Sequence, residues 1–245
     1  MRFLKKLITL TLFFLFLALI VGGGVLTWEG YQIYQAAVSQ MPLQEKVAQI
    51  RENQNYTPFS DLPETYVNAV VAVEDKRFYM HGGIDLISTG RALFINLREK
   101  ELAEGGSSIT QQLAKNMYFS QEKKILRKVA ELFVAFDLER AYTKEEILEL
   151  YVNTIYFGSG YYCVYDAAQG YFGKLPEEMT DYESTLLAGI PNAPSVYALT
   201  NRPELAAQRQ RQVLACMVKQ DYLTEQQAEE ILVEVEQAAG TVGSN

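Results

Sequence analysis

The sequence contains one histidine and two cysteines in 245 residues. A single histidine excludes paired-histidine zinc sites of the HExxH type, and a Ser-His-Asp triad could only be centred on His81. Cys163 and Cys216 cannot form a disulfide framework, and the sequence has no CxxC pair for zinc or redox chemistry. It also lacks the glycine patterns of P-loops and dinucleotide-binding folds. The motif-defined forms of these chemistries are therefore excluded.

Positive charge is scarce as well. The chain has 22 Lys and Arg against 30 Asp and Glu, a net charge of −8. Because nucleic-acid binding depends on clustered Lys and Arg that neutralise phosphates, we expect no nucleic-acid partner. With 49% hydrophobic residues the chain can bury a core. Its length suits one globular domain with an appendage. Residues 233–245 are predicted to form an acidic tail.

The appendage is apolar. Residues 7–28 carry no charge and are long enough to cross a hydrocarbon layer of about 30 Å at about 1.5 Å per residue. Basic residues precede this run, and Glu29 follows it. By the positive-inside rule, residues 1–6 form a cytoplasmic tail, residues 7–28 span the cell membrane once, and the rest is extracytoplasmic. A cleaved signal peptide and a buried core helix are the alternatives. The run exceeds a typical signal h-region and no A-x-A site follows it.

Beyond the membrane segment, the pattern predicts a mostly α domain. Residues 29–54 are interpreted as a connector. Ser60 or Asp61 is expected to cap a helix with Pro63 in its first turn, and Thr143 with Glu146 forms a capping-box pattern. Strand signals are scarce. The charged, glycine-containing segment 99–106 is predicted to be a mobile loop that orders when ligand binds.

Two glutamates are candidates for chemistry. The apolar run 69–73 precedes Glu74, so burial and the negative end of a helix dipole should raise the pKa of its carboxyl and strengthen it as a base. Glu131 follows Arg127 by four residues on a predicted helix. An ordinary surface acid and a plain ion pair are the alternatives. Two carboxylates in one cleft are what glycosyl chemistry uses.

Positive charge gathers locally despite the acidic whole. Five cations fall within fourteen residues: Lys115, Lys123, Lys124, Arg127 and Lys128. They could form an anion cradle for phosphate or pyrophosphate, or simply a solvated helix face. Hydrogen-bonding side chains lie beside them, including Ser108, Gln112 and Asn116. That combination favours the cradle.

Five segments in this order resemble the motifs of the peptidoglycan glycosyltransferases, glycosyltransferase family 51. They are AVVAVEDKRFYMHGGID at 69–85, GGSSITQQLAKN at 105–116, RKVAELFVAFDLE at 127–139, KEEILELYVNTIYFGSGYYCV at 144–164 and STLLAGIPNAPSVY at 184–197. The resemblance covers residues 55–232. Three departures stand out: Ser108 for a usual Thr, Cys163 for a usual Gly, and Ala198-Leu199 for a usual Asn-Pro.

The resemblance implies a lysozyme-like, mostly helical lobe with a smaller, membrane-facing jaw lobe. It implies transfer of a growing lipid-linked glycan onto the GlcNAc 4-hydroxyl of lipid II with inversion. Glu74 would be the base, with Glu131 assisting near the pyrophosphate. Substrate would be bound by Asp75, Phe78, His81, Arg91, Ser108, Gln112, Lys115, Asn116, Arg127 and Lys128.

The expected partners are lipid II, the nascent glycan, the cytoplasmic membrane and other cell-wall synthesis proteins. No cofactor is obligatory; Mg²⁺ at the pyrophosphate is the one candidate. No transpeptidase motif follows the five segments, so the chain is interpreted as monofunctional. A lytic, lysozyme-like muramidase is the rival enzyme, and a membrane-anchored scaffold of the wall machinery is the rival without catalysis.

Overall fold

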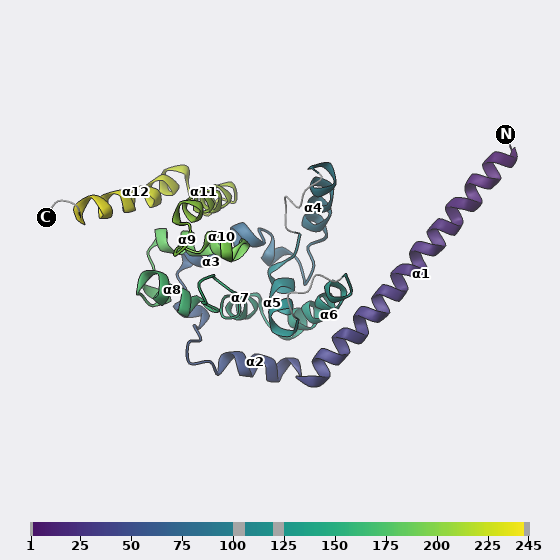
Figure 1. Cartoon of the computed structure of the whole chain (residues 1–245), viewed down its shortest axis with the longest axis horizontal. Helices are drawn as coiled ribbons and strands as arrows, with labels where there is room; N and C mark the ends of the chain where they lie inside the picture. The colour runs from purple at the N-terminus through teal and green to yellow at the C-terminus, as the bar shows by residue number, and fades with distance from the viewer. Residues whose placement is uncertain (1, 100–105, 120–124, 243–245) are drawn as a thin grey trace.

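The computed structural model describes residues 2–99, 106–119 and 125–242 (Figure 1). These ranges hold twelve α-helices and four short 3-10 segments, and they contain no strand. The prediction of a mostly α fold is therefore confirmed. Most of the predicted mobile loop, and Lys123 and Lys124 of the positive cluster, lie outside the described residues.

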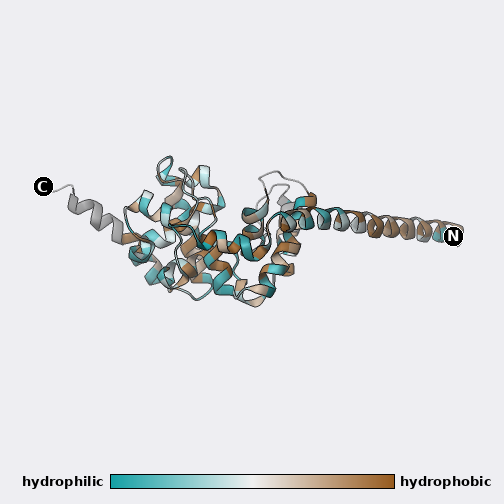
Figure 2. Ribbon diagram, turned by 90° about the horizontal axis from the view of Figure 1, so that it is seen from below, coloured by the Kyte–Doolittle hydropathy of each residue, from teal (hydrophilic) through white to brown (hydrophobic). Residues whose placement is uncertain are grey.

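The first helix, α1 (Arg2–Gln40), projects from the helical body. Within the described residues it is the one helix long and apolar enough to cross a membrane, and the hydrophobic window within it has no buried residue. Figure 2 shows its hydrophobic residues running outward to the N-terminus, with more polar residues near the body. The helix does not stop at Trp28. It continues to Gln40, and α2 (Leu43–Arg51) follows after Pro42, so most of the predicted connector is helical.

The centre of the body is α3 (Glu64–Glu74), which packs against α9 (Asp181–Gly189) and α11 (Pro203–Lys219). The final helix, α12 (Glu225–Val242), packs on α9. Ser60 and Asp61 lie in a separate 3-10 turn, η1 (Phe59–Asp61), and α3 begins only after Pro63. The expected cap was wrong because the residue before a proline is driven out of the helical region; Leu62 has φ −90° and ψ 129°.

A second group of helices surrounds α5 (Ile109–Tyr118). It packs against α6 (Ile125–Ala141) and α7 (Lys144–Val152). Ser108 with Gln111 forms a capping box at the start of α5, and Thr143 with Glu146 forms the predicted one at the start of α7. The remaining helices are α8 (Val164–Phe172) and the short α10 (Pro194–Tyr197). One buried core joins both groups.

Helix α4 (Leu86–Glu99) stands out from the body on the side where α1 leaves it (Figure 1). Leu86, Ile87 and Phe94 on this helix are exposed. Large apolar side chains on a projecting helix favour contact with a nonaqueous surface. Helix α4 thus forms an arm that exposes apolar side chains.

Candidate active site

A cleft of about 480 Å³ opens where α3 ends. Its walls come from four places in the chain: the end of α3, the start of α4, the segment before α5 and the α9–α11 region. The lining side chains that carry charge or hydrogen-bonding groups are Glu74, Asp75, Lys76, Asp85, Ser88, Arg91, Ser107, Ser108, Asn192, Arg209, Cys216, Lys219 and Gln220.

Glu74 is the last residue of α3 and lies on the cleft wall. Its Oε2 accepts a hydrogen bond of 2.8 Å from Nε2 of Gln112. Its Oε1 is buried and has no hydrogen-bond partner among the described residues. Burial raises the pKa of the Glu74 carboxyl, although the Gln112 bond and the charges of Arg209 and Lys115 oppose this. The structure therefore gives Glu74 the strengthened basicity that its sequence context predicts.

The Gln112 amide is itself oriented by a neighbour. The hydroxyl of Tyr151, fully buried on α7, lies 3.4 Å from Gln112 Oε1 and donates to it. Because the carbonyl oxygen faces that donor, the amide nitrogen is left to face Glu74. Helices α5 and α7 thus fix the position of a side chain on α3.

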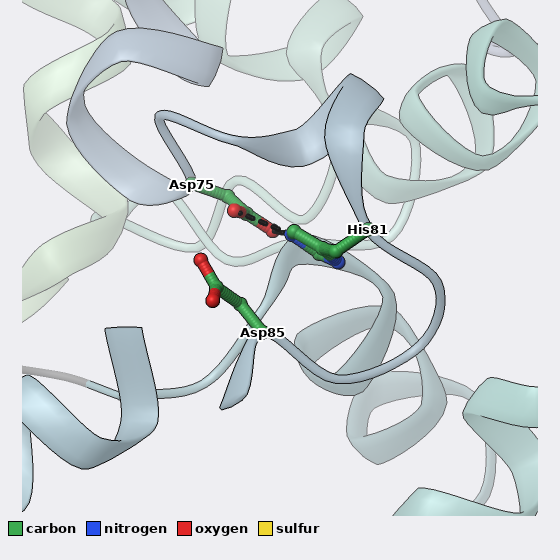
Figure 3. Close-up of side chains that lie close together, drawn as sticks. All are labelled: Asp75, His81 and Asp85. Carbon is green, nitrogen blue, oxygen red and sulfur yellow. Dashed lines mark hydrogen bonds and ion pairs between the residues drawn. The ribbon is translucent and has the colours of Figure 1, made fainter. Parts of the chain in front are cut away.

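Two aspartates tie the segment after α3 to the helices around the cleft, and Figure 3 shows Asp75 pointing toward His81, with Asp85 beside them. The Asp75 carboxylate lies 2.8 Å from Nε2 of His81 and accepts a bond from the backbone N–H of Ile109 at the start of α5. The Asp85 carboxylate accepts bonds from Arg77 and from the Ser88 hydroxyl and backbone N–H. Burial opposes ionisation of Asp85, but these donors outweigh it and hold its pKa well below its usual range.

Asp75, His81 and Asp85 place possible ligand atoms within 4.8 Å of one another. They do not fit Mg²⁺, for two reasons. The aspartate oxygens already accept hydrogen bonds, and the Arg77 guanidinium on Asp85 would repel a cation. Mg²⁺ also prefers oxygen ligands and retains its waters. This cluster therefore joins neighbouring segments of the fold through hydrogen bonds, and we assign it no metal-dependent step.

Glu131 is fully buried on α6 and organises two cations. Its carboxylate lies 2.9 Å from Arg127 Nε and 2.8 Å from Lys128 Nζ. Lys128 also donates a hydrogen bond of 2.7 Å to the hydroxyl of Ser107 on the cleft wall. The predicted i,i+4 pair between Arg127 and Glu131 is thus present, together with a second cation.

Lys115 lies within electrostatic reach of both carboxylates. Burial lowers the pKa of its ammonium, while Glu131 and Glu74 raise it and the cations Lys128 and Arg127 lower it further. A half-buried ammonium in this position can pair with an incoming anion without first losing a full hydration shell. Of the cations predicted as an anion cradle, Lys115 thus lies near the candidate base, and Arg127 and Lys128 lie near Lys115 without lining the cleft.

Some of the other residues predicted from the sequence line the cleft, and others do not. Asp75, Arg91 and Ser108 line the cleft, and Asn116 is half-buried on α5. Phe78 differs from expectation. It is fully buried beneath the ammonium of Lys144, 4.4 Å from the ring centroid, so it offers no surface to a substrate and acts through packing. Glu131 is likewise closed to direct contact with a substrate.

Several cleft residues were not predicted, and four of them lie beyond the segments that the sequence singled out for the site: Asn192, Arg209, Lys219 and Gln220. Three of them come from α11 and the residue after it, and the Gln220 amide donates to the carbonyl oxygen of Ala72 on α3. No local pattern marks Arg209 or Lys219, because they reach the cleft only through the packing of α11 on α3.

Comparison with known proteins identifies the family of this chain. Residues 42–218 match the transglycosylase family. A provisionally named transglycosylase of Cupriavidus necator is 44% identical over 184 residues, which are 75% of this chain and 79% of that protein. Penicillin-binding protein 1A of Aquifex aeolicus is 45% identical over 175 residues, 71% of this chain and 24% of that protein. Penicillin-binding protein 1F of Bacillus subtilis is 41% identical over 177 residues, 72% and 25% of the two chains.

The crystal structure of penicillin-binding protein 1A from Haemophilus influenzae is similar with a TM-score of 0.43 and 22% identity, over 72% of this chain and 17% of that one. The chain thus spans about a quarter or less of these penicillin-binding proteins and most of the C. necator protein. The match with the family covers all five motif regions. The chain belongs to the transglycosylase family, whose members are the peptidoglycan glycosyltransferases that its motifs resemble.

Proposed function

We propose that this enzyme extends peptidoglycan strands from lipid II at the outer face of the cytoplasmic membrane. The donor is the growing glycan on its lipid pyrophosphate, and the acceptor is the GlcNAc 4-hydroxyl of lipid II. Glu74 is the general base. The family supports glycan polymerisation, while the substrate, the stereochemistry and the residue roles are part of this proposal.

The observation that supports it best is the state of the Glu74 carboxylate. One oxygen is held by Gln112, and the other is buried without a partner at a cleft edged by cations. A buried carboxylate with a raised pKa can take a proton at neutral pH more readily than a solvated one. An unsatisfied acceptor also costs free energy until a donor arrives, and a sugar hydroxyl is such a donor.

The reaction balances without any redox partner. The acceptor O4 forms a bond to C1 of the donor MurNAc while the bond from C1 to the pyrophosphate oxygen breaks. Glu74 takes the hydroxyl proton, and the lipid pyrophosphate leaves with the electron pair. Attack from the face opposite the leaving group inverts the anomeric carbon, as a carboxylate-activated nucleophile does in inverting glycosidases.

The leaving pyrophosphate needs charge neutralisation more than it needs a proton. Lys115, Arg127 and Lys128 supply that charge as fixed, charge-assisted donors. Glu131 does not touch the substrate in this scheme. It is a positioning residue that holds Arg127 and Lys128 through its two ion pairs.

The membrane positions the enzyme on its lipid-linked substrate. Basic residues at the N-terminal end of α1 orient that end toward the cytoplasm. Helix α4, which carries exposed apolar side chains, lies on the side of the body from which α1 departs (Figure 1), so this arm would rest in the membrane interface. The cleft beside α4 would then lie within reach of a lipid-anchored pyrophosphate.

Incubation of the purified full chain with labelled lipid II tests the proposal. Long glycan products, lost in Glu74→Gln, are the expected result. Release of small muropeptides from finished cell wall would instead support the muramidase, and no turnover of either substrate would support a scaffold. Either of these two results would contradict the proposed function.

A further inference from the structure

The extramembrane end of α1 packs against the helical body. Along this helix the side chains from residue 3 to Glu29 are exposed, but residue 30 is buried and residues 31, 34, 35, 37 and 38 are half-buried. Their spacing follows a helical face of about 3.6 residues per turn. The surface that covers this face is α6, the helix that also bears Arg127, Lys128 and Glu131.

The two helices approach closely at Gly30. A Cβ on residue 30 would lie 2.5 Å from both Cβ and Cγ1 of Val129, and 3.2 Å from the backbone oxygen of Leu126. Real side chains do not approach so closely, so any larger residue would push α1 and α6 apart. Val129 is adjacent to Lys128 and two residues from Glu131.

Further along α6 the contact is aromatic and then polar. The rings of Tyr31 and Tyr34 lie 5.3 Å and 5.5 Å from the ring of Phe133. The Tyr34 hydroxyl donates a hydrogen bond to Oδ2 of Asp137, one turn further on. Val129, Phe133 and Asp137 are spaced by four residues, so α1 follows one face of α6 over more than two turns.

The opposite face of α6 carries the cations. At about 3.6 residues per turn, Arg127, Lys128 and Glu131 lie roughly across the helix from Val129, Phe133 and Asp137. Helix α6 is therefore held between α1 on one face and, on the other, the contacts that bring Lys128 to Ser107 on the cleft wall. A shift of α6 away from its α1 seat would move Arg127 and Lys128 relative to Glu74.

We propose that the extramembrane end of α1 is a positioning element for the pyrophosphate-binding cations, with Gly30 setting the helix separation and Tyr34 fixing its register. The inference rests on the proposed role of Arg127 and Lys128. It implies that the affinity for the donor depends on how α1 packs against α6. No residue of α1 lines the cleft in the described part of the chain.

Two matched pairs of variants test it in the full chain in detergent. Gly30→Val inserts a wedge at the crossing, whereas Gly24→Val makes the same change where a Cβ would meet nothing within 4 Å. Tyr34→Phe removes only the hydroxyl bonded to Asp137. Tyr31→Phe keeps the ring contact with Phe133 and removes only a bond from Gln35 within α1. Thermal unfolding identifies any variant that fails to fold.

The readouts are the affinity for inorganic pyrophosphate by titration calorimetry and the KM and kcat for lipid II. We expect Gly30→Val to weaken pyrophosphate binding and raise KM about tenfold, because a displacement of about 1 Å can cost up to a hundredfold. Tyr34→Phe should do the same to a smaller extent. The two control variants should match the wild type.

The inference is overturned if Gly30→Val and Tyr34→Phe bind pyrophosphate as their controls do. If Gly30→Val fails to fold, the Tyr34→Phe and Tyr31→Phe pair decides alone. Failure of the proposed function has a different signature: wild-type protein would not bind pyrophosphate, or Lys115→Ala and Arg127→Ala would bind it unchanged.

Discussion

The Gln112 amide donates a hydrogen bond of 2.8 Å to one oxygen of Glu74 and leaves the other oxygen buried and unpartnered among the described residues. This division fixes the carboxylate plane and directs a single oxygen at an incoming donor. It also sets two opposing influences on basicity, since burial raises the pKa of Glu74 and the Gln112 bond lowers it.

The pH dependence of turnover should report this balance. Glu74 must be deprotonated to act as a base, so its raised pKa should place the acidic limb of kcat/KM above the range of an ordinary glutamate. Gln112→Met removes the donor at similar side-chain length and should move the limb to still higher pH. A pH–rate profile of both proteins measures it, and a limb that stays in place in Gln112→Met would contradict the assigned role of that bond.

Replacement of Glu74 by glutamine should raise the stability of the fold near neutral pH, although it removes activity. A carboxyl whose pKa is higher in the folded chain contributes stability that is fully present below its unfolded pKa and is lost as pH rises through its folded pKa. Glutamine carries no charge and avoids that loss. We therefore expect Glu74→Gln to unfold at a higher temperature than wild type near neutral pH, with the difference shrinking toward acid. An equal or lower Tm at neutral pH would argue that Glu74 is not desolvated.

The cation cluster should act on the donor. Lys115→Ala should raise KM for lipid II by about 10- to 150-fold, the equivalent of about 1.5–3 kcal/mol for a charge-assisted contact. Arg140→Ala is the control for loss of a nearby positive charge, because Arg140 is 81% exposed at the end of α6. Steady-state kinetics of both variants decide the matter. Equal KM values for the two variants would mean that the Lys115 ammonium is a solvated charge that does not bind the donor.

The α4 arm should enter the membrane interface. In a Trp28→Phe background, Phe94→Trp should be quenched by brominated lipid tails in vesicles, because residue 94 is exposed on the projecting helix. Tyr162→Trp offers a control at an equally exposed residue, 64% accessible, on the loop before α8. Equal quenching of the two probes, or none at residue 94, would count against membrane contact by α4.

The sequence predicts what depends on local pattern. The apolar run of α1, the capping box at Thr143 and the i,i+4 pair of Arg127 with Glu131 all follow from residue spacing, and each is present. Glu74 could be singled out because an unbroken run of apolar residues, 69–73, precedes it. The long apolar helix, the helical class and the position of Glu74 near the end of a helix could therefore be predicted from the sequence.

What the sequence could not supply depends on contacts between distant helices. Arg209 reaches Glu74 only because α11 packs on α3, and Phe78 is withdrawn from the cleft by the packing around Lys144. The continuation of α1 to Gln40 falls in residues that are polar and helix-compatible and that the sequence led us to interpret as a connector. They are helical because α6 covers one of their faces, beginning at Gly30.

The central claim is that Glu74 is the base, and the polymerisation rate of Glu74→Gln tests it most directly. Glu64→Gln makes the same change on the exposed first turn of α3 and serves as the matched control. We expect glycan synthesis by Glu74→Gln to fall at least about a hundredfold, the usual contribution of a general base, while Glu64→Gln keeps the wild-type rate. A folded Glu74→Gln enzyme that retains more than half of the wild-type rate would contradict the account.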